Sequence, residues 1–238
     1  MTAIKPYRLI PIQDCNEPLV PMPMAQFCCI QPHPYEQLGA PYGEQSPFFV
    51  RQGVCDRLLT AQTYLRQQQP GWSLLIFDAF RPLAVQQFMV DYTFAQLLQQ
   101  QGFKASQLTD TQRQTLLERV YEFWALPDPD PTRPPPHSTG GAIDLTLADS
   151  TGQPIEMGSA IDELSPRSYP DYYAASEVES EQVFHRHREL LNQVMTQAGL
   201  LRHPHEWWHF SYGDQLWAWL RRQQGDRAAI ACYGRVML

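Results

Sequence analysis

The sequence predicts an α+β fold, in which strands and helices are interspersed along the chain. Residues 142–147 alternate between apolar and polar side chains, which is the two-residue period of a strand with one buried face. Over residues 53–68, apolar side chains recur instead at the spacing of one helix face. The chain has neither an internal repeat nor the rhythm of about 30 residues that a parallel βαβ fold would show. Mixed elements of this kind favour an α+β fold.

Length and composition are those of a folded globular protein. The chain has 238 residues, of which 43% are hydrophobic and 18% charged, so a mainly disordered chain is excluded. We expect a single domain over residues 1–238. With 18 Lys and Arg against 25 Asp and Glu, the formal net charge is −7, which makes nucleic acid a poor partner. No apolar run of about 18 residues is present to span a membrane.

Cysteine usage and the first residues predict a cytoplasmic location. The chain has five cysteines, an odd number, and no CxxC pair. This is unlike a disulfide framework and fits a reducing compartment. The opening residues mix Lys5 and Arg8 with two prolines and lack the uninterrupted apolar stretch of a secretory signal.

The first 50 residues are rich in proline, with nine in all. Proline fixes φ and cannot donate to a sheet ladder, so we expect this segment to be extended. Its aromatic side chains indicate that it packs on the body of the protein and is not a free linker: Phe27, Tyr35, Tyr42, Phe48 and Phe49.

Residues 53–124 carry a predicted helix, a strand and two further helices. The helix over 53–68 ends at Pro70-Gly71, and the apolar run 73–78 is typical of a buried strand. Pro82 suits the first turn of the helix that follows. Apolar side chains mark one face of that helix and then of the next: Val85, Phe88, Met89 and Tyr92, then Leu116, Leu117, Val120, Tyr121 and Trp124.

The C-terminal half begins with a stiff stretch, since six prolines lie within 127–136. The alternating strand over 142–147 follows it. A helix is predicted next, with apolar residues from Phe184 to Ala198, and it ends near Gly199, a natural C-cap. Residues 208–212 alternate again and are expected to form a strand ended by Gly213.

A histidine and a carboxylate lie at either end of the segment His137-Ser-Thr-Gly-Gly-Ala-Ile-Asp144. Asp144 is on the polar face of an otherwise apolar strand, and a buried carboxylate without a partner is costly, so a cation would suit it. Gly140 and Gly141 allow the backbone to turn so that the two side chains converge.

A second cluster, His205-Glu-Trp-Trp-His209, literally matches the HExxH motif of zinc proteases. That motif needs a continuous helix, whereas Pro204 precedes it and the residues that follow favour strands. In a strand, His205 and His209 would lie about 13 Å apart, too far to bind one ion. We therefore expect Glu206 and His209 to act as the pair, without His205. The zinc-protease interpretation requires residues 200–212 to be helical.

Three candidate metal ligands follow: His137, Asp144 and His209. Two imidazoles, one carboxylate and an open fourth position describe a catalytic zinc site. The same set of ligands occurs in non-haem iron oxygenases, although their usual His-x-Asp/Glu spacing is absent here. A polar network in the core, with no metal, is the remaining alternative.

At these residues the sequence resembles the zinc D-alanyl-D-alanine dipeptidases (the VanX type). The resemblance rests on four segments that occur in the family's order: FDAFRP, HSTGGAIDLTL, GQPIEMGSAIDE and EWWHF. It covers residues 71 to 213, roughly the catalytic core. The proline-rich first 50 residues and the last 25 match no motif of the family.

The resemblance implies a central, mostly antiparallel sheet flanked by helices and one zinc ion per chain on His137, Asp144 and His209. It implies Glu206 as the catalytic base and Arg81 as the residue that stabilises the transition state. Asp162 matches the acidic residue that holds the free amine of a small D-amino-acid dipeptide.

One position departs from the family. Proline occupies position 135, where the family usually carries a serine two residues before the first histidine. If that serine helps to hold the substrate carboxylate, another donor is needed here, and Ser138 or Thr139 is the candidate.

The expected reaction is hydrolysis by an activated water, with Glu206 as base and Arg81 beside the developing oxyanion. No nucleophilic side chain is required, in agreement with the absence of a G-x-S-x-G elbow. The alternatives are a related cell-wall D,D-carboxypeptidase or L,D-endopeptidase, and a non-catalytic zinc-binding or peptide-binding module of the same fold.

Overall fold

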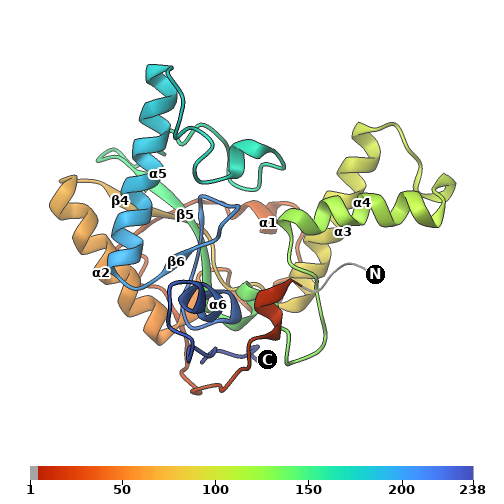
Figure 1. Cartoon of the computed structure of the whole chain (residues 1–238), viewed down its shortest axis with the longest axis horizontal. Helices are drawn as coiled ribbons and strands as arrows, with labels where there is room; N and C mark the ends of the chain where they lie inside the picture. The colour runs from red at the N-terminus through yellow and green to blue at the C-terminus, as the bar shows by residue number, and fades with distance from the viewer. Residues whose placement is uncertain (1–4, 238) are drawn as a thin grey trace.

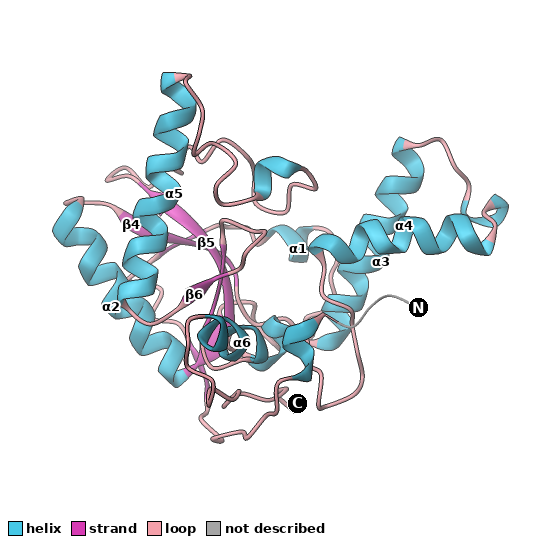
Figure 2. Ribbon diagram, viewed as in Figure 1, coloured by secondary structure: helices cyan, strands magenta, loops and turns pink. Residues whose placement is uncertain are grey.

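The computed structural model describes residues 5–237, which build a five-stranded sheet with helices around it (Figures 1 and 2). The strand order is β2-β4-β5-β7-β6. Only β2 runs parallel to its neighbour β4; the other three pairings are antiparallel. The predicted α+β fold with a mostly antiparallel sheet is confirmed. The strands are β2 (Cys28–Cys29), β4 (Ser73–Asp78), β5 (Ala142–Ala148), β6 (Leu201–Arg202) and β7 (His209–Ser211).

Two long helices, α2 (Gln52–Gln68) and α5 (Glu179–Gln197), lie side by side and cover one face of the sheet (Figure 1). The apolar positions predicted for α2 are buried in one cluster with the inward side chains of α5, β4 and β5. On β5, Ile143, Leu145 and Leu147 face this main cluster, as their alternation predicts. Asp144 and Thr146 are also buried, so the opposite face of the strand is covered as well.

A second apolar cluster lies outside the sheet, around α3 (Leu83–Gln100) and α4 (Asp110–Phe123), which project from the body as a helical hairpin (Figure 1). Thr109 caps α4 in a reciprocal capping box with Gln112. Pro82 precedes the first residue of α3, one position earlier than expected. We call this second group the hairpin cluster; it includes Tyr35, Tyr42, Val85, Met89, Val120 and Trp124.

The described part of the proline-rich N-terminal segment buries Met22, Phe27 and Tyr35, and it is not wholly extended. It forms η1 (Pro6–Leu9), the strand β1 (Leu19–Pro21), the edge strand β2 and a one-turn helix α1 (Pro34–Gln37). Pro34 begins α1, where its missing N–H leaves no helical bond unmade. Strand β1 pairs antiparallel with β3 (Phe49–Arg51) in a separate two-stranded sheet.

The remaining elements are short. They are η2 (Ala105–Gln107), η3 (Pro136–Thr139), η4 (Pro166–Ser168) and α6 (Gln215–Gln223). One of them, η2, lies in the connection between α3 and α4. The last described residues return to the N-terminal segment, since Ile12 bridges Ala231 and Val236 N–H donates to the carbonyl of Ser138. No helix formed by residues 5–237 is both long and apolar enough to cross a membrane.

One buried arginine joins the 157–169 loop to α5. Arg188 is fully buried, and no carboxylate of the described chain pairs with it. Burial lowers the pKa of its guanidinium to about 10. The guanidinium lies against the rings of Tyr173 and Trp207. It donates to four oxygens of the loop: Met157 O (2.8 Å), Ser159 Oγ (3.1 Å), Arg167 O (2.9 Å) and Tyr169 O (2.9 Å).

Replacing this arginine should destabilise the protein. Arg188→Met leaves several buried acceptors without a donor, and each such group costs about 1–3 kcal/mol. We expect a loss of at least about 3 kcal/mol in the free energy of unfolding, measured by urea titration. Arg186→Met, on the exposed side of the same helix, is the matched control and should change stability by less than about 0.5 kcal/mol. Equal urea midpoints for the two variants would contradict this role.

Candidate active site

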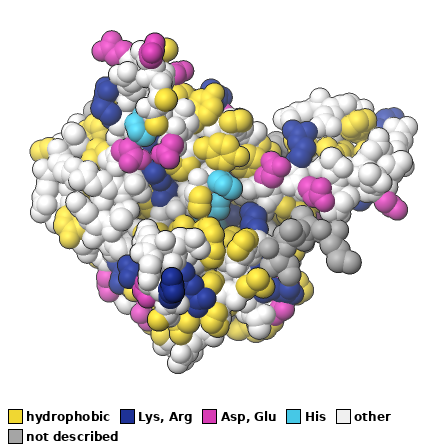
Figure 3. Space-filling view, viewed as in Figure 1, with side chains coloured by type: hydrophobic (Ala, Val, Ile, Leu, Met, Phe, Trp, Pro, Cys, Tyr) yellow, Lys and Arg dark blue, Asp and Glu magenta, His cyan; other side chains and the backbone are white. Residues whose placement is uncertain are grey.

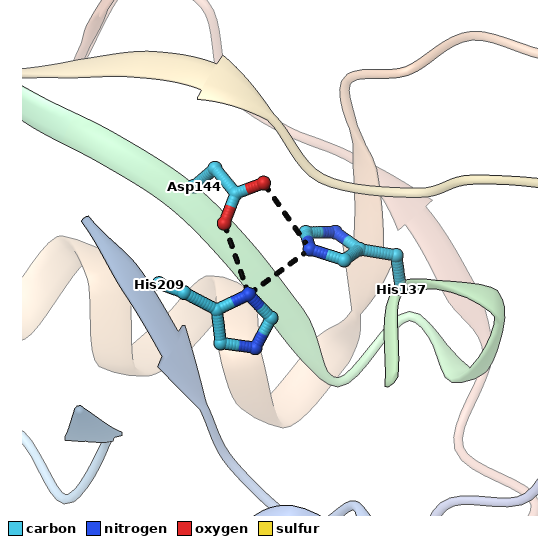
Figure 4. A group of neighbouring side chains, drawn as sticks. All are labelled: His137, Asp144 and His209. Atoms are coloured by element: carbon cyan, nitrogen blue, oxygen red, sulfur yellow. Dashed lines mark hydrogen bonds and ion pairs between the residues drawn. The ribbon is translucent and has the colours of Figure 1, made fainter. Parts of the chain in front are cut away.

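Three side chains converge on the face of the sheet opposite α2 and α5 (Figure 4). Asp144 on β5 lies directly opposite His209 on β7, so their side chains leave the sheet on the same side. His137 comes from η3, immediately before β5. Between them, Gly140 has φ +70°, and an added Cβ would lie 2.6 Å from a methyl of Leu19. This turn therefore requires glycine, as the sequence predicts.

The distances within this group are those of ligands around one ion. Nε2 of His137 lies 3.2 Å from Oδ2 of Asp144 and 3.2 Å from Nδ1 of His209. Nδ1 of His209 lies 3.0 Å from Oδ1 of Asp144. One ligand atom from each residue falls within 4.8 Å of the others, and all three residues are buried.

The hydrogen bonds around the group leave these atoms free to bind a cation. Nδ1 of His137 lies 2.7 Å from the carbonyl oxygen of Ala79 and donates to it, which leaves the lone pair of Nε2 facing the group. Nε2 of His209 faces the hydroxyl of Ser211 at 3.3 Å, and that hydroxyl donates to Asp214. Oδ1 of Asp144 is buried and has no hydrogen bond of suitable geometry. The residues therefore fit a divalent metal with mixed nitrogen and oxygen ligands.

Glu206 lies next to this group, and His205 does not. A carboxylate oxygen of Glu206 is 3.7 Å from Nδ1 of His209, and the other is 3.7 Å from Nδ1 of His203. Burial raises the pKa of Glu206 to about 7. Residues 200–212 form no helix, and His205 is exposed, so the zinc-protease interpretation of HExxH is wrong. Glu206 and His209 are instead brought together by the turn that leads into β7.

Arg81 reaches the group from the end of β4. Its Nη2 lies 3.4 Å from Oδ2 of Asp144, but its main partner is Asp78, at 2.7 and 3.0 Å. Burial alone would lower the pKa of the guanidinium, but the charge of Asp78 outweighs it, so the pKa is raised. The guanidinium also lies 5.0 Å from the ring centre of Trp124. It is therefore a fixed cation beside Asp144.

Asp78 is a buried partner of Arg81 that the sequence did not single out. It is fully buried and occupies the same cross-strand row as Asp144, after a bulge in β4. His33 lies 3.1 Å from one of its oxygens, and Tyr42 donates to the same oxygen at 3.0 Å. Burial opposes ionisation of Asp78, yet the charge of Arg81 and the hydrogen bond with His33 lower its pKa. The only signal in the sequence was a carboxylate at the end of an apolar strand, three residues before Arg81.

Asp162 lies on the wall of the same pocket, with φ +62°. The hydroxyl of Tyr35 donates to its carboxylate at 2.5 Å. Burial, with the charge of Asp144, raises the pKa of Asp162 to about 7. The sequence predicts only an apolar packing role for Tyr35 and gives no sign of this pairing.

Ser138 and Thr139 are occupied by local structure. The hydroxyl of Ser138 donates to the carbonyl oxygen of Arg81 at 2.8 Å, and that of Thr139 donates to the carbonyl of Pro136 at 2.6 Å. Neither residue lines the pocket, so the proposed contact of Ser138 with substrate stays a prediction.

The pocket has a small inner part and a wide outer part. The inner cavity, of about 40 Å³, holds the metal-ligand group together with Arg81, Asp162 and Glu206. It opens into an outer groove of about 780 Å³. In the space-filling view, apolar, acidic and basic side chains surround a recess near the middle of this face, beside a histidine (Figure 3). Five residues line both parts: Lys5, Tyr7, Phe123, Trp124 and His203.

The whole chain was compared with known proteins and with known protein families. A solved structure, that of the LdcB LD-carboxypeptidase, covers 94% of both chains with a TM-score of 0.45 at 12% identity, a likeness too weak to bear on activity. A D-alanyl-D-alanine dipeptidase of Escherichia coli (strain K12) is 35% identical over 60% of this chain and 56% of its own. One of Synechocystis sp. is 51% identical over 99% of this chain and 98% of its own. The peptidase family M15 model for D-Ala-D-Ala dipeptidases matches residues 29–228. The chain therefore belongs to the D-Ala-D-Ala dipeptidase family of peptidases.

Proposed function

We propose that this protein hydrolyses the dipeptide D-alanyl-D-alanine with one bound zinc ion. The observation that carries the proposal is the convergence of His137, Asp144 and His209 with Glu206 and Arg81 in one buried pocket. Zinc, when bound there, would supply a Lewis acid that polarises the scissile carbonyl and acidifies the attacking water. The products are two molecules of D-alanine.

Glu206 is suited to move the proton. With its pKa raised to about 7, its carboxylate can accept a proton from the attacking water near neutral pH. Its position beside His209 places it next to the metal ligands. The same proton then passes to the amine that leaves when the C–N bond breaks, which restores the carboxylate.

Arg81 is suited to stabilise the oxyanion that develops on the carbonyl. Asp78 and Gln86 already hold its guanidinium, so it needs no reorganisation when negative charge appears. Asp162, held by Tyr35, is suited to pair with the free amine of the dipeptide. The residues that are given these roles match the family motifs.

The alternatives fit less well. A D,D-carboxypeptidase or L,D-endopeptidase acts on longer chains and needs no anion for a free amine, whereas Asp162 lies in the small inner cavity. A non-catalytic binding module needs neither Glu206 nor Arg81 beside the ligand group.

The first test is loading and product analysis. Protein supplemented with zinc should hold one ion per chain and convert D-Ala-D-Ala to D-alanine, measured by metal analysis and chromatography. Chelation should abolish cleavage but leave the circular dichroism spectrum unchanged, because the main apolar cluster does not depend on the ion. His209→Ala should lose the zinc, while His205→Ala, on an exposed side chain, should keep it. Zinc-loaded protein that leaves the dipeptide intact would refute the proposal.

The second test concerns Glu206. Glu206→Gln keeps the shape of the side chain and removes the base, so it should retain zinc while kcat falls by about 10²–10⁴-fold. Metal analysis and steady-state kinetics on the same preparation measure both. Near-normal turnover in this variant would assign Glu206 a structural role.

The third test concerns the amine end of the substrate. An N-acetylated D-Ala-D-Ala cannot pair with Asp162 and leaves its carboxylate buried and unpaired. We expect it to be cleaved at least about 10²-fold more slowly than the free dipeptide, the effect of losing one partner of a buried ion pair. Asp162→Asn tolerates the positive φ and should shrink that difference. Equal rates on the blocked and free substrates would favour a carboxypeptidase.

A further inference from the structure

The pocket is acidic, yet a free dipeptide also carries a carboxylate. Three carboxyl groups line the inner cavity, those of Asp144, Asp162 and Glu206. A substrate carboxylate that enters this field needs a cation or several donors, because an unpaired buried charge is costly. The other side chains of the pocket show which group can supply that positive charge.

The arginines of the pocket are already paired. Arg81 is held by Asp78 on one side and by Gln86 on the other. In the outer groove, Arg8 pairs with Asp128 at 2.9 Å, and Arg133 also pairs with that carboxylate, at 3.2 Å. A substrate anion would have to compete with these carboxylates for each guanidinium.

The hydroxyl groups next to His137 are not available either. Proline occupies position 135 and offers no side-chain donor. The hydroxyls of Ser138 and Thr139 donate to backbone carbonyls, and neither side chain lines the inner cavity.

Lys5 is the cation that remains. It lines both the inner cavity and the outer groove, and no described carboxylate forms an ion pair with its ammonium group. Burial lowers the pKa of its ammonium group, and Glu206, which lines the same inner cavity, is the charge that acts on it most strongly. Such a group gains most when an anionic ligand enters.

The backbone holds Lys5 in place. It immediately precedes η1, and its carbonyl accepts the N–H of Arg8 at 3.0 Å. Gln215 of α6 donates to the carbonyls of Arg8 (3.3 Å) and Ile10 (2.6 Å), and the ion pair with Asp128 fixes Arg8 itself. The side chain therefore enters the pocket from an anchored segment.

We propose that Lys5 is a specificity-determining residue that binds the C-terminal carboxylate of the substrate. This rests on the dipeptidase function proposed above, with Asp162 taking the amine. Asp162, held by Tyr35, and Lys5 line the same inner cavity, so this cavity offers an anion and a cation to the two ends of a dipeptide. A substrate that spans both must carry both free ends, which limits its length.

The chain offers a matched control, because Lys5 and Lys104 are its two lysines. Lys104 is exposed, next to η2 in the connection between α3 and α4. Lys5→Met, Lys5→Arg and Lys104→Met should be compared with the unsubstituted protein on D-Ala-D-Ala and on its C-terminal amide, all loaded with zinc. Circular dichroism checks that each variant is folded.

Loss of a charge-assisted contact to the carboxylate should raise KM for the free dipeptide by about 10- to 100-fold in Lys5→Met. The value of kcat should change little, because the contact exists in both the ground state and the transition state. The preference for the acid over the amide should largely disappear in this variant, return in part in Lys5→Arg and stay unchanged in Lys104→Met.

Two results would overturn the inference: an unchanged acid-to-amide preference in Lys5→Met, or a fall in kcat that is equal on both substrates. The second would mean that Lys5 acts through Glu206 and not on the substrate.

If the unsubstituted protein cleaves neither substrate, the dipeptidase function fails instead. Calorimetry then tests the carboxylate contact by measuring binding of the dipeptide and its amide to zinc-loaded Glu206→Gln, with and without Lys5→Met. A preference for the acid that Lys5→Met removes supports the contact. A preference that Lys5→Met leaves unchanged, or no preference in Glu206→Gln itself, rejects it.

Discussion

The register of three neighbouring strands is the constraint on which the whole site depends. Asp78, Asp144 and His209 occupy one row across β4, β5 and β7. A shift of one residue in either pairing would turn the side chains of that strand to the opposite face, into the main apolar cluster. The bulge between Ile76 and Asp78 adjusts β4 so that its terminal carboxylate joins this row. The apolar residues that alternate with Asp144 hold the register, because they are buried only in this alignment.

Three buried carboxyl groups that line the inner cavity, together with Asp78 behind Arg81, fall into two classes. Asp78 and Asp144 are close to cationic or hydrogen-bonding partners, which lower their pKa values although burial acts the other way. Burial raises the pKa values of Glu206 and Asp162 to about 7. Carboxyl groups whose environments separate their pKa values in this way are suited to different tasks. Partners decide the pKa at Asp78 and Asp144, whereas burial decides it at Glu206 and Asp162.

Local patterns predicted the elements of the fold better than the contacts between them. Helix α2 and strand β5 follow from apolar spacing within a single segment, and Pro204 with the residues after His209 correctly indicated that HExxH is not helical here. The edge strand at Cys28 could not be predicted, because it forms only by pairing with β4 among surrounding prolines. The partners of Asp78 and Asp162 were missed for the same reason. They come from the N-terminal segment, and no spacing in the sequence indicates contacts at such separations.

The pocket lies between two separately packed cores, and this arrangement divides its parts between them. Trp208 and the apolar residues of β5 and β7 belong to the main apolar cluster, whereas Tyr35 and Trp124 belong to the hairpin cluster. Small apolar clusters open locally at a lower free energy than the central sheet does. Local opening of the projecting hairpin would therefore affect Tyr35 and its hydrogen bond to Asp162, while Asp144 and His209 keep their register. One pocket is thus built from two cooperative units of different stability.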